Sequence, residues 1–117
     1  DGRYPHPTLG LLGYSINAAL AEALGLPVER GVLVAQLARG GPADAAGVRG
    51  AQQEVIIGNR RVLAGGDIIT HLDGQPLADW NGLLEYLQLN KRVGEPVMLS
   101  LLRDGQPLEV EATLGAE

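Results

Sequence analysis

The sequence contains no cysteine and no phenylalanine, and aromatic side chains make up only 3% of its 117 residues. Without cysteine, neither a disulfide framework nor a thiolate metal site can form. So few aromatic rings also leave little surface on which nucleic-acid bases or sugars could stack. Apolar residues still make up 45% of the chain, so we expect a core built from Leu, Val, Ile and Ala.

Basic residues are few as well: nine Lys and Arg stand against fourteen Asp and Glu, which gives a net charge of −5. The adjacent pairs Arg60-Arg61 and Lys91-Arg92 are too short to neutralise many phosphates, so we expect no nucleic-acid partner. No apolar run approaches the roughly 18 residues of a membrane span, and we expect none in this chain. The chain begins at Asp1 without a signal peptide, so we expect it to be a piece of a longer protein.

The order of the expected elements is mixed rather than a regular alternation of strand and helix. This order favours a mainly β α+β domain, or a partly open barrel, with about five to seven short strands capped by two or three helices. Asn17 and Asp79 are the expected helix N-caps. Strands are expected at residues 9–16, 31–38, 54–64, 67–74, 96–103 and 107–114, and helices at 18–24, 42–47 and 80–89.

Two prolines and a glycine make residues 1–8 a linker or an extended arm, and residues 9–115 are expected to form a single domain. Residues 116–117 would then be a short tail. The segment 50–66 is expected to hold a hairpin that turns near Gly58-Asn59. A second hairpin is expected at Asp104-Gly105.

The serines lack the sequence context of a nucleophile. Ser15 and Ser100 both lie in expected strands, outside any Gly-x-Ser-x-Gly or Gly-Asp-Ser-Gly motif. None of the glycine-rich segments carries the Lys-Ser/Thr pair of a phosphate-binding loop. We therefore expect a non-catalytic domain that does not bind nucleotides.

The possible metal ligands are also dispersed. His6 and His71 are isolated, and Asp67, Asp73 and Asp79 each lie at a turn or a helix cap. The sequence therefore predicts no metal site and no cofactor.

One combination of segments does predict binding. Leu9-Gly10-Leu11 leads into residues 12–15, a strand that could leave one edge unpaired, and an amphipathic helix begins far along the chain at Trp80. Side by side, the strand and the helix would form a groove in which an extended polypeptide adds as a further strand. Gly10 would let successive amide groups converge on an anion such as a terminal carboxylate.

Four blocks of this sequence occur in a particular order from about Leu9 to Gly115. They are Thr8-Leu9-Gly10-Leu11; residues 31–34 with 41–43 and 46–48; residues 66–69 with 73–77; and Arg103-Asp104-Gly105 with Leu114-Gly115. Together these blocks resemble the PDZ domains of HtrA-type, trypsin-like serine proteases. The early position of the binding loop and the late position of the helix are similar to the circularly permuted bacterial arrangement.

The resemblance implies a module that captures extended C-terminal tails by β-strand addition. Trp80 stands where PDZ domains that prefer Ser or Thr two residues before the ligand terminus carry His, so an apolar ligand residue is expected there; Trp80 could instead plug the core. Gly13 stands where a bulky residue is common, which predicts a deeper pocket. The implied peptide-binding residues are Thr8, Leu9, Gly10, Leu11, Leu12, Gly13, Tyr14, Trp80, Leu84 and Leu87.

Several roles remain open at this point. The module could recognise substrates for, or regulate, an attached HtrA-type protease in the periplasm or cell envelope. It could instead assemble domains or subunits, or belong to a membrane-embedded metalloprotease. The hairpin between Glu54 and Ala64 departs from the family pattern, and could contact a neighbouring domain or be decorative.

Overall fold

The computed structural model describes residues 6–116, which form a mainly β domain with three helices. The strands are β1 (Pro7–Thr8), β2 (Leu11–Ser15), β3 (Val32–Leu37), β4 (Gln53–Ile57), β5 (Arg60–Ala64), β6 (Ile68–Leu72), β7 (Gln75–Pro76), β8 (Pro96–Arg103), β9 (Gln106–Thr113) and β10 (Gly115–Ala116). The helices are α1 (Ala18–Leu24), α2 (Pro42–Ala45) and α3 (Trp80–Asn90). The predicted α+β class is confirmed; β1, β7 and β10 are two-residue pieces beyond the seven longer strands.

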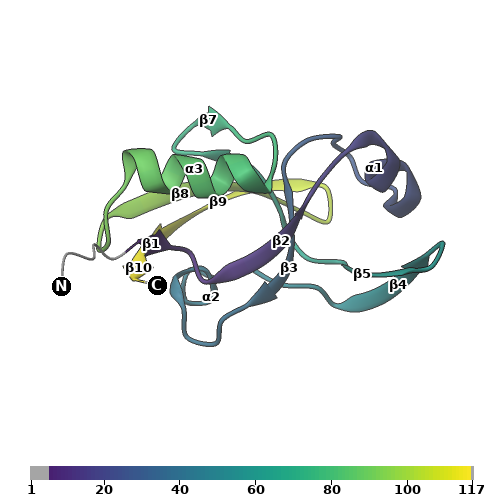
Figure 1. Cartoon of the computed structure of the whole chain (residues 1–117), viewed down its shortest axis with the longest axis horizontal. Helices are drawn as coiled ribbons and strands as arrows, with labels where there is room; N and C mark the ends of the chain where they lie inside the picture. The colour runs from purple at the N-terminus through teal and green to yellow at the C-terminus, as the bar shows by residue number, and fades with distance from the viewer. Residues whose placement is uncertain (1–5, 117) are drawn as a thin grey trace.

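The central sheet has the strand order β2-β3-β6-β8-β9, and each neighbouring pair is antiparallel. Strand β2 lies at one end of this order, and α3 lies beside it (Figure 1). Strand β1 pairs with β10, so the two ends of the described chain meet next to α3 (Figure 1). The first five residues of the predicted arm and the last residue of the predicted tail lie outside the described residues.

The main core is aliphatic, as the composition predicts. Leu83 and Leu87 of α3 are almost fully buried in one core cluster with Leu72 of β6, Leu99 of β8 and Leu9 from the loop before β2. Side chains of this kind pack without polar groups that would need partners. The two buried leucines therefore fix α3 over the sheet, with one of its faces turned toward β2.

A smaller cluster holds α1 at the far end of β2. Ile16 and Ala21 pack with Leu33 and Ile68, and the Asn17 side chain accepts a hydrogen bond from the Leu20 amide at 2.8 Å. The predicted caps at Asn17 and Asp79 are both confirmed, because Asp79 Oδ1 accepts from the Gly82 amide at 2.7 Å. Each cap satisfies an amide that the first helical turn leaves without a partner.

A buried ion pair joins the residue that precedes β6 to the end of β8. Asp67 is 1% exposed, and its carboxylate accepts hydrogen bonds from Arg103 Nε at 2.9 Å, Arg103 Nη2 at 2.7 Å and the Arg49 amide at 2.9 Å. Arg103 also donates to the Gly47 carbonyl at 2.8 Å. The hydrogen bond to Asp67 raises the pKa of Arg103. The pair therefore ties the end of β8 to the segment that follows α2.

The predicted hairpin is confirmed as the two-stranded unit β4–β5, which turns at Gly58-Asn59 and pairs Gln53 with Ala64 at its base. The Ala51 amide donates to the Ala35 carbonyl at 2.9 Å and connects this base to β3. Figure 1 shows the hairpin extending from the sheet on the same side of the molecule as α1.

Candidate functional site

A groove of about 250 Å³ lies between β2 and α3 and is called here the β2–α3 groove. Its apolar walls are Leu9, Leu11 and Leu12 on the strand side and Trp80, Leu84 and Leu87 on the helix side. Within residues 6–116, β3 is the only strand that pairs with β2, so the edge of β2 that faces α3 keeps its backbone groups available. This edge can accept one more strand.

The loop that enters β2 turns its amide groups toward the open side. The Leu9 carbonyl accepts from the Ala43 amide at 2.9 Å, and the Gly10 carbonyl accepts from the Ala38 amide at 2.8 Å. In a trans peptide the N–H group points opposite to the preceding carbonyl, so the amides of Gly10 and Leu11 point away from α2 and β3. Gly10 achieves this turn with φ of +69°, a conformation that favours glycine.

Thr8 already interacts with this loop, because its hydroxyl oxygen accepts a hydrogen bond from the Gly10 amide at 3.1 Å. The amide of Gly10 is therefore satisfied by a neutral oxygen in this structure. A carboxylate oxygen is a stronger acceptor and could replace the hydroxyl, because charge-assisted hydrogen bonds are about twice as strong as neutral ones. The loop thus has the chemistry of a small anion site.

Trp80 fixes the opposite end of the groove. Its backbone amide donates to Ser15 Oγ at 2.9 Å, which ties the start of α3 to the end of β2. Its half-buried side chain lines the groove and also packs against the main core. Trp80 therefore lies both at the groove and against the core, so the two positions that the sequence left open are compatible.

Gly13 does not deepen the groove, and this expectation was wrong. A Cβ atom at Gly13 would lie 2.5 Å from Val32 Cγ1 and 2.8 Å from the Leu33 carbonyl oxygen, so a side chain there would collide with β3. The register between β2 and β3 shifts between Leu12 and Gly13, which marks a bulge. The glycine is required by this close approach of the two strands.

Tyr14 also lies outside the β2–α3 groove. Its hydroxyl oxygen accepts from the Leu63 amide at 3.3 Å and so contacts the β4–β5 hairpin. Of the ten residues implied by the resemblance, the structure gathers seven side chains around the groove, and Gly10 lies in the loop that enters β2. Those seven are Thr8, Leu9, Leu11, Leu12, Trp80, Leu84 and Leu87.

Sequence reasoning missed four groove residues: His6, Pro7, Leu83 and Gln88. Gln88 follows Leu84 by four residues on α3, so helical periodicity could have found it. His6 and Pro7 reach the groove because β1 pairs with β10 more than a hundred residues later, and no local pattern reports that pairing.

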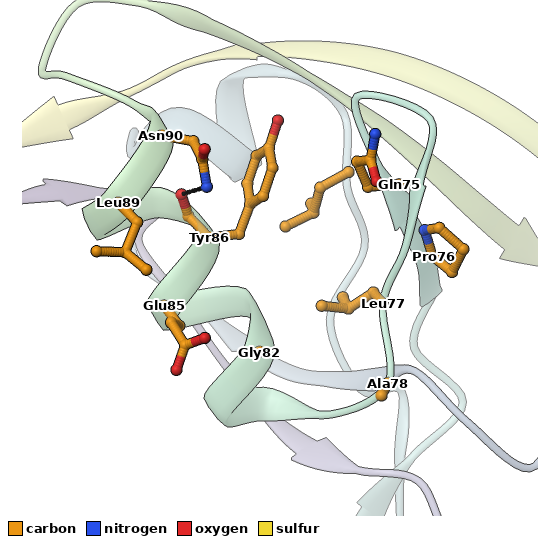
Figure 2. A pocket seen from close by; sticks show the side chains of 10 residues that line it. Gln75, Pro76, Leu77, Ala78, Gly82, Glu85, Tyr86, Leu89 and Asn90 are labelled. Carbon is orange, nitrogen blue, oxygen red and sulfur yellow. Dashed lines mark hydrogen bonds between the residues drawn. The ribbon is translucent and has the colours of Figure 1, made fainter.

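A second hollow, of about 520 Å³, lies on the opposite face of α3. Figure 2 shows Tyr86 of α3 and Leu77 facing each other across it, and Glu85 and Leu89 of α3 also line it. The Tyr86 hydroxyl donates to Asp73 Oδ2 at 2.8 Å, next to the ion pair of Asp73 with Lys91 at 2.9 Å. This hollow adjoins a structural network, and the strand at its rim is the two-residue β7 rather than the longer β2.

The Asp73 network changes the acidity of its members. Partial burial raises the pKa of Asp73, but hydrogen bonds from the Met98 amide, Lys91 and Tyr86 lower it more, so the pKa lies below its ordinary value of 3.8. The hydrogen bond to Asp73 raises the pKa of Lys91 and of Tyr86. The network therefore keeps Asp73 ionised to a lower pH than an ordinary aspartate.

The residues considered for catalysis and metal binding are dispersed. Ser15 bonds to the Trp80 amide, Ser100 Oγ donates to Glu109 at 3.4 Å, and His71 bonds to Thr70 at 2.9 Å. His71 lies opposite Ser100 in the β6–β8 ladder, but within residues 6–116 no hydrogen bond joins either serine to a histidine. Across residues 6–116, no three His, Asp or Glu side chains gather closely enough to hold a metal ion. None of the three helices in that range has the length and apolar character of a membrane span.

The match of the PDZ domain family to residues 10–114 covers nearly the whole chain. The chain therefore belongs to the PDZ domain family, as its sequence blocks indicate. It is 35% identical over 113 residues to the periplasmic pH-dependent serine endoprotease DegQ of Escherichia coli (strain K12), covering 97% of this chain and 21% of that protein. It is 29% identical to the periplasmic serine endoprotease DegP of the same organism, and the match covers 97% of this chain and 20% of that protein. The chain thus spans about a fifth of these relatives.

Solved structures give the same result for the fold. The HtrA-type protease AlgW with a decapeptide is similar with a TM-score of 0.72 and 27% identity, covering 97% of this chain and 30% of that chain. The HtrA3 PDZ domain bound to a phage-derived ligand has a TM-score of 0.71 at 21% identity, and the match covers 95% of this chain and 86% of that chain. The resemblance to HtrA-type PDZ domains is confirmed.

Proposed function

We propose that this domain binds the extended C-terminal ends of other polypeptides by adding them as a strand to β2. The observation that carries the proposal is the open edge of β2, which faces α3 across an apolar groove. Similar structures with a bound decapeptide and a phage-derived ligand support it. The domain itself acts by binding and not by catalysis.

The terminal carboxylate would bind at the amides of Gly10 and Leu11 and displace the Thr8 hydroxyl. The last ligand side chain would then enter the pocket between Leu11 and Leu87. The side chain two residues earlier would lie near Trp80, where an apolar group replaces water most favourably. The ligand is therefore a free C-terminus with apolar residues at its last and third-from-last positions.

The size of the contact sets the expected affinity. About three or four strand hydrogen bonds contribute about 0.5–1.5 kcal/mol each, and one buried aliphatic side chain contributes about 1.5–3 kcal/mol. Ordering the peptide and losing its free motion offset several kcal/mol. We expect a Kd of about a micromolar, which corresponds to about −8 kcal/mol.

We further propose that the domain serves an attached HtrA-type serine protease, by recognising its substrates or regulating it, in the periplasm or cell envelope. The similarity to DegQ and DegP over nearly all of this chain supports this context. A longer chain with a protease domain would be the partner in the same molecule.

Peptide titration tests the binding proposal. Fluorescein-labelled peptides with apolar last and third-from-last residues are titrated by fluorescence polarisation, each as a free acid and as a C-terminal amide. The free acid is expected to bind about tenfold or more tightly, because only it can accept two charge-assisted hydrogen bonds from the loop. Equal binding of the two forms would refute the role of the Gly10 and Leu11 amides.

A further inference from the structure

A second pocket, of about 300 Å³, lies at the far end of β2 and is called here the hairpin pocket. It is enclosed by the end of β2, by α1 and by the β4–β5 hairpin, the segment that departs from the family pattern. Its walls include Tyr14 and Ser15 of β2, Ala19 and Ala23 of α1, and Ile57 and Arg60 of the hairpin. Figure 1 shows α1 and the hairpin lying beyond the end of β2.

The hairpin is held in place by the domain's own contacts. The Leu63 amide donates to the Tyr14 hydroxyl, and the Ala51 amide donates to the Ala35 carbonyl of β3. Val62 and Ala64 of β5 are buried. The pocket is therefore formed before any partner arrives, which lowers the ordering cost of filling it.

The hairpin pocket begins where the β2–α3 groove ends. Ser15 lines the pocket, and its hydroxyl also accepts the hydrogen bond from Trp80, which lines the groove. A tail whose carboxylate lies at Gly10 must run antiparallel to β2, toward Ser15. The four steps from Leu11 to Ser15 span about 13 Å at about 3.3 Å per residue. Ligand residues about five to seven positions before the terminus therefore reach this pocket.

The walls of the pocket define what it can hold. Ala19, Ala23 and Ile57 are apolar, and Arg60 is the single charged side chain among the described residues that line it. Side chains alternate along a strand, so Arg60 faces the pocket whereas Arg61 faces away and lies 3.8 Å from Glu54. An apolar side chain with an acidic neighbour fits this combination.

We propose that the hairpin pocket is a second subsite for the same bound tail, which accepts an apolar residue about five to seven positions before the terminus and prefers an acidic residue beside it. The proposal rests on the function proposed above, because the tail must first lie along β2. The hairpin would thus lengthen the stretch of ligand sequence that the domain reads.

The test compares peptides of two lengths on matched charge variants. A five-residue peptide fills only the groove; two ten-residue peptides share the same last five residues and carry an apolar residue with either Glu or Lys in the upstream segment. The domain is used as wild type, Arg60→Glu and Arg61→Glu. Both substituted arginines are exposed and lie on the same strand, so the two variants make the same change of charge.

We expect the Glu-containing ten-residue peptide to bind wild type more tightly than the five-residue peptide. Arg60→Glu should lower the affinity for the Glu-containing ten-residue peptide about three- to tenfold and raise the affinity for the Lys-containing one, as expected when an exposed charge contact is reversed. Arg61→Glu should change neither affinity by more than about twofold, and the five-residue peptide should bind all three proteins equally.

The outcomes separate the two proposals. If the five-residue peptide binds and the longer peptides bind no better, the subsite is refuted while strand addition stands. Equal effects of the two arginine substitutions would also overturn it, because they would reflect net charge alone. If no free-acid peptide binds, the proposed function fails first.

Discussion

The buried pair of Asp67 and Arg103 allows a quantitative test of what holds the sheet together. Asp67→Ala removes an almost fully buried carboxylate and its three hydrogen bonds at 2.7–2.9 Å, two of them from the Arg103 guanidinium. The Arg49 amide then loses its acceptor, and Arg103 keeps only the Gly47 carbonyl and water. The variant therefore leaves a desolvated donor and an unpaired charge at the joint between β6 and β8.

The expected loss of stability is about 3–5 kcal/mol, the range for removing one partner of a buried ion pair. The exposed fraction of the Arg103 side chain is 24%, so water can solvate part of the orphaned guanidinium, and we expect a value near the lower limit. The total free energy of unfolding of a small domain is only about 5–15 kcal/mol, so this loss would be a large fraction of the total.

Urea unfolding monitored by fluorescence provides the measurement, because Trp80 is the single tryptophan in the sequence and is half-buried. The matched control is Arg61→Ala, which breaks the contact of Arg61 with Glu54, where the two side chains are 77% and 50% exposed. The control should change the free energy of unfolding by less than about 1 kcal/mol. If Asp67→Ala costs no more than the control, the buried pair does not stabilise the sheet and our interpretation is wrong.

Three further predictions concern the groove and its supports. Trp80→Ala should lower the affinity for peptides with an apolar third-from-last residue about tenfold in polarisation titrations. The affinity for peptides with Gly at that position should fall much less. An equal loss of affinity for both kinds of peptide would show that Trp80 acts through the fold alone. Gly13→Ala should lower the free energy of unfolding by about 1–3 kcal/mol in urea titrations, because the new Cβ meets the backbone of β3; a neutral effect would contradict the close approach. The pKa of Asp73 is lowered in the folded state, so its stabilising contribution is complete above the unfolded value of about 3.9 and is lost as the pH falls through the lower folded value. Lys91→Ala should therefore reduce the loss of stability on acidification below about pH 4, whereas an unchanged pH profile of unfolding would exclude this linkage.

Local patterns predicted a large part of this domain. The aliphatic character of the core follows from composition alone. The Asn17 and Asp79 caps and the hairpin turn at Gly58-Asn59 depend on residues close together in the chain. The placement of Leu11 and Trp80 along one groove followed from sequence blocks in a familiar order. Periodicity and turn chemistry carry this information because each acts within one helical turn or one hairpin.

The rest depends on contacts between distant segments. Asp67 was interpreted as a turn residue, and its partner Arg103 lies 36 positions away. The need for glycine at position 13 arises from β3, and the contact of Tyr14 with Leu63 spans 49 residues. Strand register and the packing of an inserted hairpin set these contacts, and neither can be inferred from the residues on one side of the contact.

The placement of α3 beside the open edge of β2 also governs what happens after a strand is added. An exposed sheet edge is usually a template for endless growth, because each new strand offers its own outer edge to the next. Here the outer edge of the added strand would face the α3 side chains Trp80, Leu84 and Leu87, which offer no backbone ladder. Strand addition in this domain is therefore self-limiting: one chain completes the sheet, and polymerisation through this edge is blocked.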